Sequence, residues 1–246
     1  MRRRPGFRAQ LDVLIDRVLA VHMGSAGTML LLAAQAPAIG ACVGLAWRAA
    51  SPTASAHFVM SVAAVWMGCM NACTAIVQER AVFDRERMFD LDIRAYLLSK
   101  LAVLATLGAV QAALLLASAG ALMHLPASPR ALALEFLALT ATSAAAAALG
   151  LCISAFAKSA QGAVVIVPIL LIPQVVFSKL ILREAIERDV PKWLHRLTLT
   201  KWCFEALENA PNDVKWLDQM GAWAALAAWT AVFFSVAAFK LRLDDS

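Results

Sequence analysis

The chain has 246 residues, of which 61% are hydrophobic and only 16% are charged, and its net charge is +5. Soluble domains average about 45–50% apolar and about 25% charged residues, so this chain has too few charges to cover an aqueous surface. The same apolar excess excludes an intrinsically disordered chain. The composition therefore predicts an integral membrane protein.

The first expected element is an amphipathic helix within residues 1–22. Apolar residues recur there at helical spacing and charged residues lie off the apolar stripe, which predicts a helix at the membrane surface. A plain soluble extension is the alternative. Charges within the apolar region, at Asp12, Asp16 and Arg17, argue against a cleaved secretory signal. The stripe consists of Phe7, Leu11, Leu14, Ile15, Val18 and Leu19.

Residues 23–246 are expected to form one membrane domain with six transmembrane helices. Each apolar segment approaches the roughly 20 residues that cross about 30 Å of hydrocarbon as a helix. A membrane barrel would need short alternating strands, so the fold is predicted to be all-α. Small residues such as those at 144–148 permit close helix packing. The spans are placed at about 23–47, 57–78, 100–123, 131–157, 159–182 and 219–240.

The distribution of Lys and Arg predicts the orientation. Eleven of these residues lie in the N-terminal region and the short loops on its side of the membrane, against two in the short loops on the other side. Positive residues favour the cytoplasmic side. Both termini are therefore predicted to be cytoplasmic, in a plasma membrane of the bacterial inner-membrane type.

Ionisable residues within or beside the spans are few. His22, His57 and His124 stand at predicted span ends, where a ring can reach the headgroups, and none is spaced with a carboxylate as an acid/base or metal pair. Glu135 lies near the start of the fourth span, where the helix dipole favours negative charge; a proton or ligand site is the alternative. Known catalytic motifs are also missing. The sequence therefore predicts no catalytic residues, no metal site and no enzymatic activity in this chain.

Polar residues in the second and fifth spans must face protein or water. For Asn71 and Gln174, hydrogen bonds between helices are favoured over contact with a substrate. Met67 and Met70 are open to two interpretations, as core packing or as an adaptable apolar surface for a ligand.

The segment between the second and third spans has the densest charge, with both signs interleaved. Its spacing predicts a short solvated helix whose apolar residues dock on a cytoplasmic partner. The alternative is a charged loop that only anchors the topology. The residues expected to dock are Glu79, Arg80, Phe83, Asp84, Arg85, Glu86 and Arg87.

This segment also carries a resemblance to a known family. Ile76–Arg87, followed by Ala95–Lys100, resembles the first cytoplasmic loop of ABC type-2 exporters of the G (White/pleiotropic drug resistance) subfamily. Phe177–Ile181, Val190–Leu194 and Trp202–Leu207 resemble the end of the fifth helix and the outer re-entrant segment of that subfamily. The amphipathic start is similar to its connecting helix.

The resemblance implies a permease half that pairs with a second copy, or with a homologous permease, around a shared pathway. An ATP-binding cassette subunit would bind ATP and Mg²⁺, so no cofactor is expected in this chain. This subunit would contact the coupling helix formed by the charged segment. No nucleic acid is expected among the partners. Leu180 and Ile181 would form the outer gate. The substrate-lining residues implied are Ala64, Met67, Met70, Asn71, Pro168, Ile172 and Val175.

The implied function is export of an amphipathic or lipid-like substrate. In the subfamily an ATP-binding domain usually precedes the membrane domain, and none precedes Met1 here, so the ATPase is expected to be a separate polypeptide unless the sequence is an excerpt. The alternative function is a membrane scaffold or lipid-modifying protein without an ATPase partner, for which the sequence offers no acid/base or metal cluster.

Overall fold

The computed structural model describes residues 6–24, 26–48, 53–88, 91–124, 128–177, 195–210 and 216–243. Within these ranges the regular structure is helical. Its elements are α1 (Phe7–Met23), α2 (Ala26–Ala46), α3 (Ala54–Ala72), the 3₁₀ turn η1 (Val77–Glu79), α4 (Arg80–Arg87), α5 (Ile93–Gly120), α6 (Pro129–Phe156), α7 (Ala160–Val176), α9 (Leu199–Asn209) and α10 (Trp216–Leu243).

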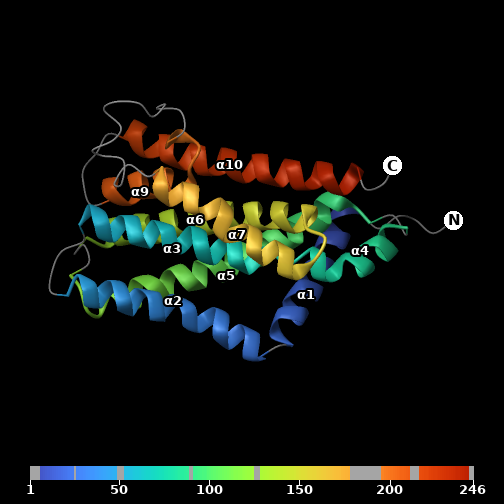
Figure 1. Cartoon of the computed structure of the whole chain (residues 1–246), viewed down its shortest axis with the longest axis horizontal. Coiled ribbons are helices and arrows are strands. Elements are labelled where there is room, and N and C mark those ends of the chain that lie inside the picture. The colour runs from blue at the N-terminus through green and yellow to red at the C-terminus, as the bar shows by residue number, and fades with distance from the viewer. Residues whose placement is uncertain are drawn as a thin grey trace.

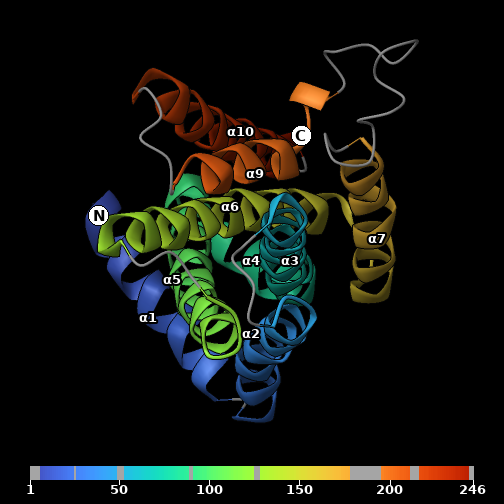
Figure 2. The ribbon, with the colours of Figure 1, turned by 90° about the vertical axis from the view of Figure 1, so that its left-hand side faces the viewer.

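Helices α3 and α6 pack against each other at the centre of the bundle (Figure 2). On one side α9 and α10 cover α6, and on the other side α2 packs on α5. Helix α7 stands at the flank, in contact with α3, α6 and α9. Only Ala163, Val167 and Leu171 of α7 are buried, so most of its surface is uncovered in a single copy of the chain.

Small residues set the distance between α3 and α6. A Cβ atom added at Gly68 would lie 2.3 Å from the carbonyl oxygen of Ser143, and one at Gly150 would lie 2.6 Å from that of Cys69. The alanines at 145–148 are buried in the same contact. The close packing predicted for this run is therefore confirmed, because any larger side chain would force the two backbones apart.

Four helical segments of the described chain are long and apolar enough to cross a membrane: Ala54–Arg87, Ile93–Gly120, Pro129–Phe156 and Gln219–Leu243. Two shorter apolar helices, Leu30–Ala46 and Ala160–Val176, accompany them. The helix boundaries differ most from the expected ones between the second and third predicted spans, which were placed at 57–78 and 100–123. Helix α3 ends at Ala72, and α5 begins at Ile93, where the Asp92 side chain accepts a hydrogen bond from the backbone N–H of Arg94 at 2.8 Å.

The two ends of the bundle differ in what they carry. The start of α1, helix α4 and the end of α10 lie at one end, and α9 lies at the other (Figure 1). The end that carries α1 and α4 also holds most of the ion pairs among the described residues. It is therefore the first place to look for a functional site.

Candidate functional site

Helix α1 packs on α5 through its predicted apolar stripe. Leu14 and Val18 are buried, and Leu11 packs against the cluster that contains Tyr96 of α5. The two ends of the stripe, Phe7 and Leu19, remain exposed. Only the middle turns of the stripe therefore pack against the bundle. This contact holds α1 against α5.

Helix α4 is amphipathic, and its single buried residue is Phe83. The Phe83 ring packs on that of Tyr96, with 4.8 Å between the ring centroids. The guanidinium of Arg87 lies 5.8 Å from the centroid of Phe83. Asp84 and Arg85 are exposed. Phe83 therefore anchors α4 to the bundle, and the exposed charges face away from it.

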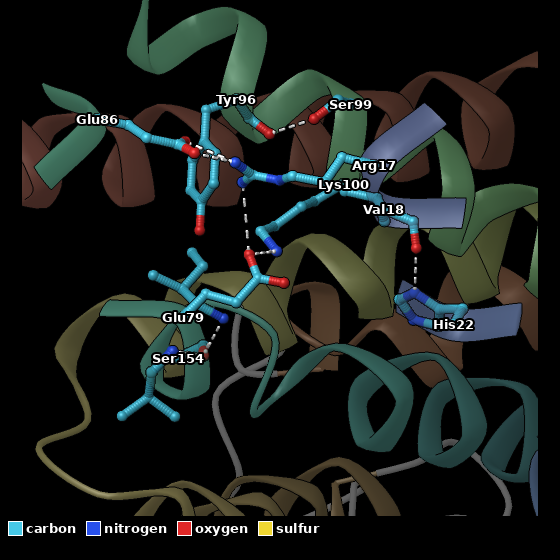
Figure 3. A network of polar contacts seen from close by, with 11 residues as sticks. Arg17, Val18, His22, Glu79, Glu86, Tyr96, Ser99, Lys100 and Ser154 are labelled. Atoms are coloured by element: carbon cyan, nitrogen blue, oxygen red, sulfur yellow. Dashed lines mark hydrogen bonds and ion pairs between the residues drawn. The ribbon is translucent and has the colours of Figure 1, made fainter. Parts of the chain in front are cut away.

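Four charged side chains join α1, α4, η1 and α5 (Figure 3). Nη1 of Arg17 donates to both carboxylate oxygens of Glu86, at 2.5 and 2.6 Å. Nη2 of Arg17 lies 3.7 Å from Oε2 of Glu79, and Nζ of Lys100 donates to the same oxygen at 2.7 Å. The Lys100 side chain is only 3% exposed. Two cations thus balance two carboxylates, as burial requires.

The turn between α3 and α4 is held to α6 by polar contacts. The backbone N–H groups of Ile76 and Val77 donate to Oγ of Ser154, at 2.9 and 3.0 Å. The guanidinium of Arg80 donates to the carbonyl oxygens of Ala155 and Ala157 near the end of α6. Helix α4 therefore contacts α1, α5 and α6 at once, so a displacement of α4 would be transmitted to all three helices.

This network includes residues whose role the sequence did not reveal. Arg17 was expected to lie off the apolar stripe of the N-terminal helix and Lys100 at the start of the third span, and no ion-pair partner was predicted for either. The available signal was the position of Lys100, one helical turn after Tyr96 on the same face of α5. Its ion pair with Glu79 depends on the contact between α5 and η1, which a pattern within one segment does not predict.

A polar cluster crosses the bundle deeper in the fold. Nδ2 of Asn71 donates to Oε1 of Gln111 at 2.7 Å, and Nε2 of Gln35 donates to Oδ1 of Asn71 at 3.3 Å. Gln111 in turn donates to the carbonyl oxygen of Leu32. The interhelical hydrogen bonds predicted for Asn71 are confirmed, and they link α2, α3 and α5.

The residues predicted to line a substrate pathway lie in different surroundings. Ala64 and Met67 are buried in the cluster that joins α3 to α5 and α9. Met70 and Asn71 line a cavity of about 420 Å³ between α1, α2, α3 and α5. Ile172 is 61% exposed on the outer surface of α7.

The rest of α7 links to α9. Pro168 and Val175 are half-buried. Oε1 of Gln174 accepts a hydrogen bond from the backbone N–H of Leu199 at 3.1 Å, so the interhelical interaction predicted for Gln174 is also confirmed. The predicted gate residues, Leu180 and Ile181, lie outside the described residues.

One sequence-based interpretation is wrong. His57 was expected to reach the headgroups without a carboxylate partner, and Glu135 to sit at the interface. Instead the Nε2 atom of His57 lies 3.7 Å from Oε1 of Glu135, and their side chains are 6% and 0% exposed. Neither atom has a hydrogen-bond partner among the described residues. The prediction failed because α3 and α6 cover both side chains when they pack.

An all-helical chain with several apolar helices of membrane-spanning length is an integral membrane protein. The particular family follows from comparison of the sequence with known families. The ABC-2 type transporter family matches residues 9–210, and the chain belongs to this family. The matched region includes α1, the charged network, α4 and α9.

A relative among the curated proteins is the ABC transporter ATP-binding/permease protein Rv1747 of Mycobacterium tuberculosis. It is 27% identical over 208 residues, and the match covers 75% of this chain and 24% of that protein. The chain thus spans about a quarter of the length of this relative. The shared part is a permease-type membrane domain.

Proposed function

We propose that this chain is the membrane-spanning half of an ATP-driven exporter. Two permease halves, either two copies of this chain or one copy and a homologous permease, would enclose the pathway. Helices α2, α3, α5, α6, α7 and α10 would be the six spans. Helix α1 would serve as the connecting helix expected within residues 1–22, and the outer re-entrant segment would lie between α7 and α10. Membership of the ABC-2 type transporter family supports this architecture.

The observation that carries the proposal is the construction of α4. It is a short helix at one end of the bundle, anchored by Phe83 and bonded through Glu86 to α1. Its exposed charges, Asp84 and Arg85, are available to a partner. Because α4 contacts α1, α5 and α6, a displacement of α4 by a bound partner would also displace these three helices.

We assign the partner as an ATP-binding cassette subunit, which would bind ATP and Mg²⁺. The name of the mycobacterial relative, an ATP-binding/permease protein, supports this pairing. The end that carries α1 and α4 would then face the cytoplasm, together with both termini, in a plasma membrane of the bacterial inner-membrane type. The likeness of Ile76–Arg87 to the G subfamily supports α4 as the coupling helix.

The substrate proposed is amphipathic or lipid-like. The exposed Ile172 and the half-buried Pro168 and Val175 of α7 would line the pathway when a second permease half covers this helix. Ala64, Met67, Met70 and Asn71 would line the opposite wall after α3 rearranges. Leu180 and Ile181 would close the pathway on the outer side.

A co-purification experiment tests the partner. The chain would be expressed in its native host with an affinity tag, extracted in mild detergent, and the co-purifying proteins identified by mass spectrometry. The test variant is Asp84→Arg with Arg85→Glu, because both side chains are exposed and the net charge is unchanged. Glu86 is left intact, since its reversal would also break the internal bond to Arg17.

The control variant reverses Lys201 and Glu205, an ion pair of 3.5 Å on α9 at the other end of the bundle. We expect an ATP-binding subunit to accompany the native chain and the control, and to be lost from the α4 variant. Recovery of the chain without any ATP-binding subunit would overturn the proposed function. Retention of the subunit by the α4 variant would overturn the docking role of α4.

A further inference from the structure

The cavity between α1, α2, α3 and α5 is lined by both polar and apolar residues. Its volume is about 420 Å³, which falls within the roughly 300–1,000 Å³ of ordinary small-molecule sites. The apolar lining residues are Val21, Leu32, Met70 and Ala75. The polar lining residues are His22, Asn71, Thr74, Gln78, Glu79 and Lys100.

Hydrogen-bond donors among the polar lining residues are left unused. Nζ of Lys100 carries three N–H groups, and among the described residues only Glu79 accepts a hydrogen bond from it. The Thr74 and Gln78 side chains make no hydrogen bond within the described part of the chain. These groups would donate to a phosphate group that entered the cavity.

Acceptors are unused among the same polar residues. Oε2 of Glu79 faces Lys100 and Arg17 (Figure 3), whereas its second oxygen accepts no hydrogen bond within the described part of the chain. The Nδ1 atom of His22 lies 2.8 Å from the carbonyl oxygen of Val18. In the tautomer that donates from Nδ1 to this oxygen, Nε2 is an acceptor. A carboxylate oxygen and an imidazole nitrogen suit the N–H groups of an ammonium ion.

Charge balance restricts the ligand further. Arg17 and Lys100 already neutralise Glu79 and Glu86 around this cavity. An anionic ligand would add one uncompensated charge to a partly buried site, which is costly. A ligand with one positive and one negative group adds none, and it would engage both the unused donors and the unused acceptors.

The corner between α1 and α2 supplies an apolar surround. Val21 lines the cavity and is itself 55% exposed. Met23, Leu30 and Leu31 follow at this corner and are also exposed. An amphiphile whose headgroup enters the cavity would therefore lay its acyl chains against this surface.

We propose that this cavity binds the phosphoethanolamine headgroup of a membrane lipid. The phosphate contacts Lys100, Thr74 and Gln78, and the ammonium contacts Glu79 and His22. The bound lipid touches the ion pair that holds α5 to the turn before α4, so it acts on the same network as the proposed ATP-binding partner. The inference rests on the proposed function only in placing the α1 end at a bilayer surface.

Native mass spectrometry of the full chain tests this site. The protein is purified in detergent together with its partners, stripped of lipid, and titrated with phosphatidylethanolamine, phosphatidylglycerol and phosphatidylcholine that carry identical acyl chains. Phosphatidylglycerol lacks the amine, and phosphatidylcholine lacks the N–H donors on its amine. We expect phosphatidylethanolamine to bind about tenfold more tightly than either, the size of one charge-assisted hydrogen bond.

Two variants locate the binding. Glu79→Gln with Lys100→Met removes both charges and should bind the three lipids alike. Its control, Glu205→Gln with Lys201→Met, removes an equivalent pair on α9 and should keep the preference. If the first variant fails to fold, Thr74→Val with Gln78→Leu replaces it, and should weaken phosphatidylethanolamine binding about threefold or more by removing two phosphate donors.

The inference would be overturned if the native chain bound the three lipids equally, or if the preference for phosphatidylethanolamine survived in the Glu79 and Lys100 variant. It would also be overturned if soluble glycerophosphoethanolamine bound as tightly as phosphatidylethanolamine, because the ligand would then be a soluble aminophosphate. The ATP-binding subunit is counted in the same preparations. Loss of lipid preference with the subunit present refutes only the lipid site, and absence of the subunit refutes only the proposed function.

Discussion

The ion pair between Lys100 and Glu79 yields the sharpest prediction for the stability of the fold. Replacement of Lys100 by Met leaves the Glu79 carboxylate with only the guanidinium of Arg17, at 3.7 Å. Breaking a fully buried ion pair costs about 3–5 kcal/mol. The Glu79 side chain is 23% exposed and keeps a cation nearby, so we expect a cost of about 2–3 kcal/mol.

This cost should appear as a lower melting temperature. For a chain of this length, about 2–4 °C is lost for each kcal/mol, so Lys100→Met should melt about 4–12 °C below the native protein. The added variant Glu79→Gln removes the stranded charge and should recover more than half of that loss. The measurement is the loss of the far-ultraviolet circular dichroism of the helices on heating in detergent.

The control is Lys158→Met, which removes an exposed lysine without disturbing an ion pair that the structure describes. It should melt within about 2 °C of the native protein, since surface substitutions rarely exceed about 0.5 kcal/mol. A Lys100→Met protein that melts with the native, or a double variant that melts below the single one, would refute the reasoning that a buried carboxylate is stranded.

Three further predictions concern packing, the α3–α4 turn and cysteine chemistry. Gly68→Ala should lower the melting temperature by several degrees because its Cβ would meet α6, whereas Gly221→Ala, with open space around it, should not. Ser154→Ala leaves two backbone N–H groups of the turn unsatisfied, so hydrogen exchange there should speed up at least about tenfold; unchanged exchange would contradict the assigned contact. Burial raises the pKa of the Cys203 thiol to about 11, so at pH 8 only about one thiol in a thousand is ionised, and maleimide should label Cys203 after unfolding but not before.

Local patterns in the sequence predicted much of the scaffold. Long apolar runs predicted apolar helices, and the run of small residues at 144–148 predicted close helix packing, which the structure shows between α3 and α6. The mixed charges at 79–87 predicted a short helix, which is α4. These predictions succeed because hydropathy and helical periodicity are properties of neighbouring residues, and the bilayer strongly restricts the possible folds.

The functional geometry was only partly accessible in this way. The short charged helix proposed to dock could be located, but the pattern did not distinguish Phe83, which packs inward on Tyr96, from the exposed Asp84 and Arg85. Substrate-lining positions on α3 were equally ambiguous, since Met67 is buried in the core while Asn71 reaches a cavity. Which face of a helix meets which neighbour is not encoded in a single segment.

The sequence by itself thus determines that the chain is an integral membrane protein, that it is helical, and that it belongs to the ABC-2 type transporter family. The tertiary structure alone decided which ionisable side chains meet: Arg17 bonds to Glu86, across 69 residues of chain, and His57 lies beside Glu135, both buried between α3 and α6. Such pairs arise where packed helices exclude water and a lone charge would be costly. The packing of segments far apart in the sequence therefore determines which side chains pair, and the periodicity of a single segment does not predict it.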